Sequence, residues 1–210
     1  MSAAQGVVVW ALVGLVVGAS LVPATRRVMN NRPSMRALLP IAAAITGALF
    51  ALVIWQLPGW PEVLGYSAFA ALAVPLAVVD LTEQRLPTPL VRSSYAAVVT
   101  AIAISALMNG ETSSAIRAAA GMIGLLTVYL AIGLAFPREL GAGDVRLAGV
   151  IGAVLSWHSW TTFVAGAALI AVSGCVVGLA VLVVRRAPRQ TQIPAGPTML
   201  LGALLALMLA

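Results

Sequence analysis

The chain alternates long runs of apolar residues with short polar connections over its whole length. A helix of about 20 apolar residues is long enough to cross a hydrocarbon core roughly 30 Å thick. Eight such runs can be marked, at 4–22, 38–57, 63–80, 94–108, 115–136, 146–157, 160–184 and 197–210. The sixth and eighth runs are short, and the seventh is long enough to tilt. The pattern predicts an all-α fold, a polytopic membrane bundle of about eight transmembrane helices.

Composition supports this class and excludes a soluble protein. Hydrophobic residues make up 61% of the 210 residues and charged residues only 9%, and the mean hydropathy is +1.05, outside the range of soluble domains. No connection has room for a soluble domain, so residues 1–210 are expected to form one integral membrane domain. Because Arg26 and Arg27 follow the first run and no basic residue precedes it, we expect a retained span rather than a signal peptide. The single cysteine, Cys175, is expected to be a small core residue.

The twelve basic residues are all arginines, and their positions indicate membrane topology rather than nucleic-acid binding. When the connection between the first two runs is placed in the cytoplasm, the alternation of eight spans fixes the side of every other connection. Only Arg117 then lies on the opposite side, as the positive-inside rule expects, and both termini are predicted to lie outside. The cytoplasmic set is Arg26, Arg27, Arg32, Arg36, Arg85, Arg92, Arg138, Arg146, Arg185, Arg186 and Arg189.

The connections on the opposite side carry Trp60, Trp157 and Trp160, which are expected in an aromatic belt at the membrane interface. The neighbouring His158 is expected to be interfacial rather than catalytic, because the topology places it far from the acidic residues. Small residues at four-residue spacing predict close helix packing; the pairs are Gly14 with Gly18 and Gly174 with Gly178.

Only six carboxylate side chains occur in the chain, and two of them fall at matching depths in the predicted bundle. Asp80 ends the third run and Asp144 precedes the sixth, both on the predicted cytoplasmic side. An aspartate at the bilayer centre costs about 2.5 kcal/mol or more on insertion scales, so acids in such segments are candidates for function. Gly141 and Gly143 stand before Asp144; glycine disfavours a regular helix but lets another backbone approach closely.

Each acid also fits a structural role. Asp80 could cap the connection 81–92 or pair with Arg85, and Asp144 could be the N-cap of the sixth helix, with Arg146 or Arg138 as its ion partner. If instead the two carboxyl groups meet in a poorly hydrated cleft, both cannot ionise and one keeps its proton. Such a pair supplies a base that activates water and an acid that protonates a carbonyl oxygen, as in aspartic proteases. Spacing in the sequence leaves both interpretations open.

Four stretches, which together span nearly the whole chain, resemble the prepilin peptidases, also called type IV leader peptidases, among the Gly-x-Gly-Asp intramembrane aspartic proteases. The first is 14–20 (GLVVGAS), followed by Arg26 and Arg27. The second is 80–87 (DLTEQRLP), in which Leu-Pro follows the aspartate, and the third is 141–147 (GAGDVRL). The fourth, 193–197 (IPAGP), resembles the closing Ile-Pro-Phe-Gly-Pro of the family. Their order on this topology makes the resemblance specific.

The resemblance implies that Asp80 and Asp144 are the catalytic pair of an intramembrane aspartic endopeptidase. The implied substrate is a prepilin or pseudopilin, cut on the cytoplasmic side of the bacterial inner membrane after a short basic leader and before its hydrophobic helix. No nucleic acid is expected as a partner, and the sequence does not indicate an oligomeric state. The residues expected to support the site or to bind substrate are Gly141, Gly143, Arg146, Leu86 and Pro87.

The chain departs from the family pattern in several places. Bifunctional members carry paired Cys-x-x-Cys motifs in a cytoplasmic domain after the first span, and they methylate the new amino terminus with S-adenosylmethionine. Here the connection 23–37 has no cysteine, so we expect a peptidase without methyltransferase activity, with no cofactor and no metal. Arg146 replaces the common lysine, Thr88 replaces an aspartate or asparagine, and Ala195 replaces phenylalanine.

Other classes of protein remain as alternatives. A catalytically inactive membrane protein of pilus or secretion assembly would look similar, although the presence of both Asp80 and Asp144 disfavours it. A proton-coupled transporter would favour acids near the midplane and broken helices in symmetric halves. A metal-dependent transferase would need clustered acids to bind Mg²⁺. Asp80 with Glu83 is the only near pair, and Glu83 is interpreted as a solvated loop residue.

Overall fold

The computed structural model describes residues 3–30, 34–57, 59–110, 112–136, 140–185 and 195–209. Within these ranges every regular element is a helix: α1 (Ala3–Val28), α2 (Met35–Gln56), α3 (Trp60–Glu83), α4 (Thr88–Asn109), α5 (Thr112–Ala135), α6 (Ala142–His158), α7 (Trp160–Arg185) and α8 (Ala195–Met208). Six of them, α1 to α5 and α7, contain segments long and apolar enough to cross a membrane. The prediction of a polytopic helical bundle is confirmed, and the two runs predicted to be short are the shortest helices, α6 and α8.

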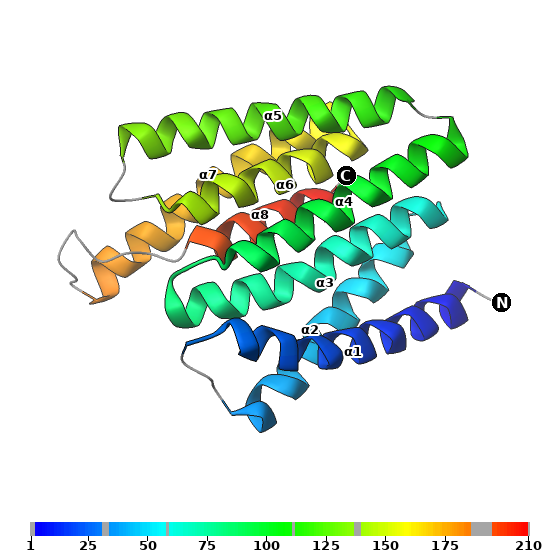
Figure 1. Ribbon diagram of the computed structural model, residues 1–210, viewed down its shortest axis with the longest axis horizontal. Coiled ribbons are helices and arrows are strands. Elements are labelled where there is room, and N and C mark those ends of the chain that lie inside the picture. The colour runs from blue at the N-terminus through cyan, green and yellow to red at the C-terminus, as the bar shows by residue number, and fades with distance from the viewer. Residues whose placement is uncertain are drawn as a thin grey trace.

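The helices alternate in direction, so that the sequence motifs gather at one end of the bundle. Figure 1 shows the last turns of α1, α3, α5 and α7 at the left and the N terminus with the first turn of α5 at the right. We call the left end the motif end. Among the described arginines it holds Arg26, Arg27, Arg36, Arg85, Arg92, Arg146 and Arg185. Arg32, Arg138, Arg186 and Arg189 lie outside the described residues, and the cytoplasmic placement of this end stays a prediction.

α3 and α4 extend further at the motif end than their apolar runs predict. α3 continues past Asp80 to Glu83 and ends at Gln84, whose φ of 51° gives a left-handed C-cap. α4 begins at Thr88, between Pro87 and Pro89. Proline has no backbone N–H, but the first N–H groups of a helix have no acceptor within the helix, so proline costs no hydrogen bond at these positions. Apolar periodicity misses these turns because helix ends near a membrane surface are polar.

α6 is the central helix, and every side chain from Leu147 to Trp157 is buried. It packs against α4, α5, α7 and α8. Glycines allow the close approach: a Cβ on Gly152 would overlap the carbonyl oxygen of Gly121 in α5, and a Cβ on Gly149 would overlap the Tyr95 hydroxyl of α4. The central part of this short helix, from Leu147 to Trp157, is therefore enclosed by its four neighbours.

The far end of α6 is capped by Arg117 of α5. Its guanidinium donates hydrogen bonds to the carbonyl oxygens of Ser156 and Trp157, each at 2.6 Å, and of His158 at 3.1 Å. These carbonyls have no partner within the helix, and a cation is favourable at the negative end of the helix dipole. The single arginine predicted for this side of the membrane thus completes the hydrogen bonding of the central helix.

The N-terminal pair of helices packs through the small residues predicted for that purpose. A Cβ on Gly14 or Gly18 of α1 would lie only 2.8 Å and 2.7 Å from the nearest atoms of α2. The prediction is wrong for Gly174, where an added Cβ would meet nothing within 4 Å, because that position faces outward from α7. The packing of Gly178 lies outside what the structure describes.

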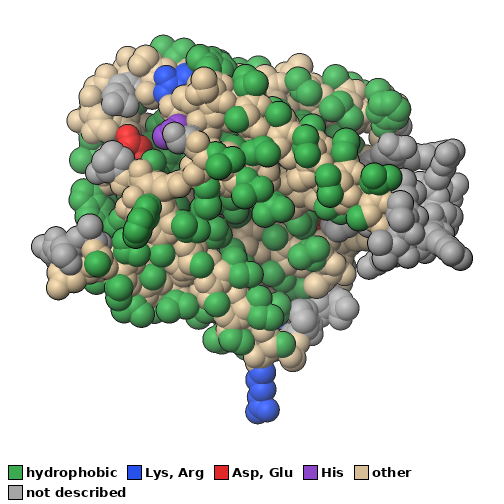
Figure 2. Space-filling view, turned by 180° about the vertical axis from the view of Figure 1, so that it is seen from behind, with side chains coloured by type: hydrophobic (Ala, Val, Ile, Leu, Met, Phe, Trp, Pro, Cys, Tyr) green, Lys and Arg blue, Asp and Glu red, His purple; other side chains and the backbone are tan. Residues whose placement is uncertain are grey.

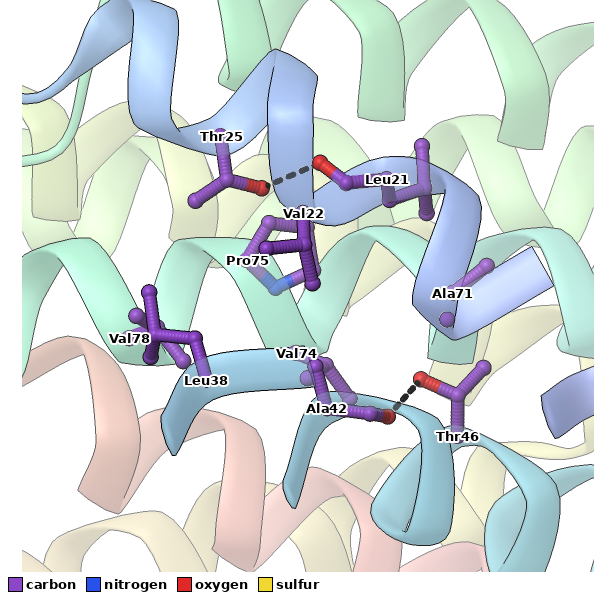
Figure 3. A pocket seen from close by; sticks show the side chains of 11 residues that line it. Leu21, Val22, Thr25, Leu38, Ala42, Thr46, Ala71, Val74, Pro75 and Val78 are labelled. Carbon is purple, nitrogen blue, oxygen red and sulfur yellow. Dashed lines mark hydrogen bonds between the residues drawn. The ribbon is translucent and has the colours of Figure 1, made fainter. Parts of the chain in front are cut away.

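A small apolar cavity lies between α1, α2 and α3 (Figure 3). Its two hydroxyl groups bond to their own helices: Thr25 Oγ1 donates to the Leu21 carbonyl and Thr46 Oγ1 to the Ala42 carbonyl, each at 2.8 Å. The other walls are Gly18, Val22, Leu38, Ala71, Val74, Pro75 and Val78. With its polar groups satisfied, this space is a packing gap and carries no chemistry.

The outer surface is that of a protein immersed in lipid. Figure 2 shows apolar side chains over most of one lateral face, with charged side chains at its margins. Trp60 and Trp160 are 63% and 51% exposed, as an interfacial belt requires. The prediction is wrong for Trp157, which is 5% exposed and stacks on Tyr66 at 5.0 Å, because it lies on the central helix. His158 is exposed at the end of α6 opposite Asp144.

Replacing Arg117 with glutamine is expected to lower the free energy of unfolding by about 2 kcal/mol, because up to three carbonyls of α6 lose a charged donor. Thermal unfolding in detergent measures the effect. Arg92→Gln is the matched control, since Arg92 is exposed and donates no hydrogen bond within the described residues. Equal melting temperatures for the two variants would contradict the capping role.

Candidate active site

The structure brings the two aspartates to the motif end of the bundle. Asp80 lies in the last turns of α3 and is 3% exposed, and Asp144 is the third residue of α6 and is half-buried. The two carboxyl groups are near enough to interact electrostatically. Residues that are 64 positions apart in the sequence thus lie at the same end of the bundle.

Asp80 is held by the start of α8. Its Oδ2 accepts a hydrogen bond of 2.9 Å from the backbone N–H of Gly196, and this contact is buried. A Cβ on Gly196 would lie 2.8 Å from the same oxygen and 3.3 Å from the carboxyl carbon, so only glycine fits without a shift. Of the closing motif, Ala195, Gly196 and Pro197 are within α8, whereas Ile193 and Pro194 lie outside the described residues.

Asp144 closes the first turn of α6. Its Oδ2 accepts a hydrogen bond of 3.1 Å from the backbone N–H of Gly141, the N-cap residue. Because glycine has no side chain to reciprocate, this is one half of a capping box. The structural alternative is therefore realised in part: Asp144 caps the helix from its third position rather than as the N-cap. The other carboxylate oxygen accepts no hydrogen bond from the described residues and is available to a ligand.

Among the described residues, the ion pairs considered for the two acids, Asp80 with Arg85 and Asp144 with Arg146, are not formed. Arg85 bonds to Glu83, with Nε 2.6 Å from Oε2, and its Nη2 donates to the Val28 carbonyl at 2.8 Å. Within the described part of the chain that is the only salt bridge. Arg138, the other proposed partner of Asp144, lies outside the described residues. Neither Asp80 nor Asp144 is neutralised by a described arginine.

Leu86 joins the second motif to the third and fourth. A Cβ on Gly143 would lie 2.6 Å from Leu86 Cβ, and a Cβ on Gly196 would lie 3.4 Å from Leu86 Cδ2. The side chain therefore sits between the first turns of α6 and α8. The buried Pro87 follows as the N-cap of α4. Leu86 and Pro87 thus belong to the short connection between the end of α3 and the start of α4.

The side chain of Arg146 contacts the start of α4. Its Nη1 lies 3.4 Å from Thr88 Oγ1, and its backbone carbonyl accepts a 2.8 Å hydrogen bond from the Tyr95 hydroxyl. Arg146 and Thr88 are two of the positions at which the chain departs from the motifs it resembles. Because the side chains of Arg146 and Thr88 are in contact, the two departures from the family motifs concern the same contact. Neither residue changes the surroundings of Asp80.

Sequence reasoning missed three residues near the acids. Glu83 is not a solvated loop residue: it ends α3, and its side chain is 6% exposed and paired with Arg85. The backbone donor from Gly196 carried no chemical signal in the sequence. Tyr129 of α5, which interacts electrostatically with Asp144, fell inside an apolar run. No group of three or more His, Cys, Asp or Glu within the described residues is placed to hold a metal ion.

Comparison with known proteins identifies the family. The model of the type IV leader peptidase family matches residues 67–183, which is more than half of the chain. The chain belongs to this family. A prepilin leader peptidase/N-methyltransferase of Myxococcus xanthus (strain DK1622) is 31% identical over 154 residues, which cover 71% of this chain and 44% of that protein. No solved structure matches the chain.

The match to the type IV leader peptidase family covers α3 from residue 67 through most of α7. It includes Asp80, Leu86 and Asp144 but ends before Gly196. The contribution of α8 to the site therefore rests on the hydrogen bond between Gly196 and Asp80. This chain spans less than half the length of its Myxococcus relative. The two activities given in that protein's name are therefore not both assigned to this chain.

Exchanging Gly143 for alanine is expected to destabilise the fold by about 1–3 kcal/mol, because the new Cβ overpacks against Leu86. Leu86→Gly removes the opposing Cβ and should restore part of that loss, so the two changes together cost less than their sum. Thermal unfolding of the single and double variants measures the coupling. Gly124→Ala in α5 is the control, since a Cβ there meets nothing within 4 Å. Strict additivity would show that this contact is not tight.

Proposed function

We propose that this protein is an aspartic endopeptidase of the cytoplasmic membrane that removes the short basic leader of type IV prepilins or pseudopilins. Asp80 and Asp144 form its catalytic pair. Membership of the type IV leader peptidase family supports the reaction class, and the name of the Myxococcus relative supports the substrate class. The observation that carries the proposal is that two carboxyl groups from α3 and α6 lie near enough to interact electrostatically, without a described cation to neutralise them.

In the proposed reaction the two carboxyl groups share one proton. The ionised carboxylate takes a proton from a water molecule, whose oxygen attacks the scissile carbonyl carbon, while the protonated carboxyl gives its proton to the carbonyl oxygen. When the tetrahedral intermediate collapses, the C–N bond breaks, the departing nitrogen takes up the proton gained from water, and one hydroxyl group of the intermediate returns its proton to the other carboxylate, so that the pair again holds one proton. The step needs no covalent intermediate. The pair titrates as a unit, so neither aspartate is assigned one role alone.

Two backbone donors keep the carboxyl groups in place for this chemistry. Gly196 N–H binds one oxygen of Asp80, and Gly141 N–H binds one oxygen of Asp144. Both donors are at helix N-termini, where the dipole favours negative charge. Each fixed oxygen leaves the second oxygen of its carboxyl group to face water or substrate.

The proposed cytoplasmic orientation follows from the arginines of the motif end. A basic leader on a substrate and a basic enzyme face lie on the same side when both obey the positive-inside rule. We further propose that the enzyme does not methylate its product. The connection between α1 and α2 has no cysteine, and Cys175 lies in α7, so no paired Cys-x-x-Cys site can form.

Asp80→Asn and Asp144→Asn are each expected to lower cleavage of a co-expressed prepilin-like substrate by about 100-fold or more, because each removes a group that transfers a proton. Asparagine keeps an oxygen that can accept the same backbone hydrogen bond, so the fold should be retained. The shortened product is quantified at matched protein levels, with Glu62→Gln at the opposite end as control. Processing that persists in either aspartate variant would favour the inactive assembly protein instead.

Gly196→Ala is expected to slow cleavage about tenfold or more, because its Cβ would displace the Asp80 carboxyl group from reacting geometry. Gly202→Ala is the matched control on the same helix: its Cβ would lie 2.7 Å from the Ile170 nitrogen of α7, an equally tight contact remote from Asp80. The kcat and KM of both purified variants are compared per folded molecule. A similar loss of kcat in both would mean that α8 acts through packing alone.

A further inference from the structure

The last turn of α1 carries two consecutive arginines that line a cavity at the motif end. Arg26 and Arg27 form one wall, with Pro23 of the same helix and Met35, the first residue of α2. The volume of the cavity is about 150 Å³. None of its lining residues belongs to the site of Asp80 and Asp144, so it is a separate feature of this end of the bundle.

One nitrogen of the Arg26 guanidinium has no hydrogen-bond partner among the described residues. Arg26 Nε is the one side-chain nitrogen or oxygen in the described part of the chain that is buried without a hydrogen-bond partner. A buried N–H without an acceptor is costly, and native structures rarely keep one unless an ion or water fills the gap. Arg27 also makes no hydrogen bond or ion pair with the described residues. Two adjacent cations therefore line a cavity to which the described residues contribute no counter-charge.

The start of α2 adds positive potential to the same place. Its first turn holds Arg36 and no acid, and its N-cap, Ser34, makes no side-chain capping hydrogen bond. Acids, not arginines, are favourable at this end of a helix dipole. The ion pair among the described residues joins Glu83 to Arg85 and does not involve Arg26 or Arg27. The described charges around the cavity are therefore positive, and an anion from outside the protein would balance them.

We propose that this cavity binds the phosphate of an anionic phospholipid. Guanidinium groups bind phosphate oxygens through paired N–H donors, and basic pockets at a membrane surface take acidic headgroups. A lipid fits better than a free anion because the exposed apolar side chain of Leu39 follows that of Met35, which lines the cavity, on the same face of α2 one helical turn further along. The acyl chains of the bound lipid lie along this face while its phosphate meets Arg26 and Arg27.

The site is connected to the chain segment that carries the second motif. Arg85 donates its 2.8 Å hydrogen bond to the Val28 carbonyl, directly after Arg27. Arg85 belongs to the α3–α4 connection, which also contains Leu86. A lipid that orders the last turn of α1 is therefore expected to stabilise the connection behind Asp80.

Native mass spectrometry of the purified full-length protein tests the site, with phosphatidylglycerol as the anionic lipid and phosphatidylcholine as the neutral one. Arg26→Gln/Arg27→Gln is expected to weaken phosphatidylglycerol binding about thirtyfold, and each single variant about fivefold. Arg92→Gln, which removes the same charge at the same end without touching the cavity, should bind like the unchanged protein. Equal binding by the double variant and the unchanged protein, or equal binding of both lipids, overturns the proposal.

Melting temperatures in neutral detergent separate a lipid from free phosphate. Phosphatidylglycerol should raise the melting temperature of the unchanged protein and of Arg92→Gln, and not of the double variant. Inorganic phosphate alone should give no such rise; an equal rise would assign the cavity to free phosphate and overturn the lipid. If the double variant does not fold, the two single variants decide by the same comparison. No readout involves cleavage, so the result is independent of the proposed peptidase activity.

Discussion

The structure depends on burying a short helix, α6, at the centre of a bundle that itself lies in lipid. The free N–H and C=O groups at the ends of this helix have no partner within the helix, and charged side chains of the protein bind several of them. Asp144 binds the Gly141 N–H at one end, and Arg117 binds three carbonyls at the other. Both charges follow the helix dipole. The glycines of α5 and α6 allow the neighbouring helices to pack closely against α6.

The hydrogen bonds at the helix ends explain how the two proposed catalytic acids can be buried in a membrane protein at a small cost in free energy. A buried carboxylate is costly unless hydrogen bonds replace its lost hydration. Asp144 receives one from the turn that it caps, and Asp80 receives one from the first turn of α8. Both acids lie at the ends of helices rather than at the centre of a span, where the insertion cost is greatest. The same contacts that make the helices stable therefore present two carboxyl groups to one small volume.

Much of this arrangement could be predicted from the pattern of apolar residues. Each of the eight runs corresponds to one helix of the described residues, including the two short ones, and the alternation of connections placed Asp80 and Asp144 at one end. The pattern failed where a helix is polar, as in the first turns of α4 before residue 94, and where an aromatic side chain turns inward, as Trp157 does. It also failed for Glu83, whose burial depends on Arg85 folding back beside it. Such contacts depend on tertiary packing, which periodicity does not describe.

The hydrogen bond from Gly196 to Asp80 was beyond sequence reasoning for a different reason. Its donor is a backbone N–H, which every residue except proline has, and it joins positions 116 residues apart. What the sequence did contain was the glycine itself, since a Cβ at that position would collide with the carboxyl group.

The same logic gives physical meaning to the motif Gly141-Ala142-Gly143-Asp144. Gly141 supplies the N–H that Asp144 accepts, and an added Cβ there would lie 3.1 Å from that oxygen. Gly143 leaves the space that Leu86 fills. Leu86 in turn contacts Gly196, so the second, third and fourth motifs meet at one side chain. Motifs that lie far apart in the sequence occur together because each glycine makes room for a residue of another motif.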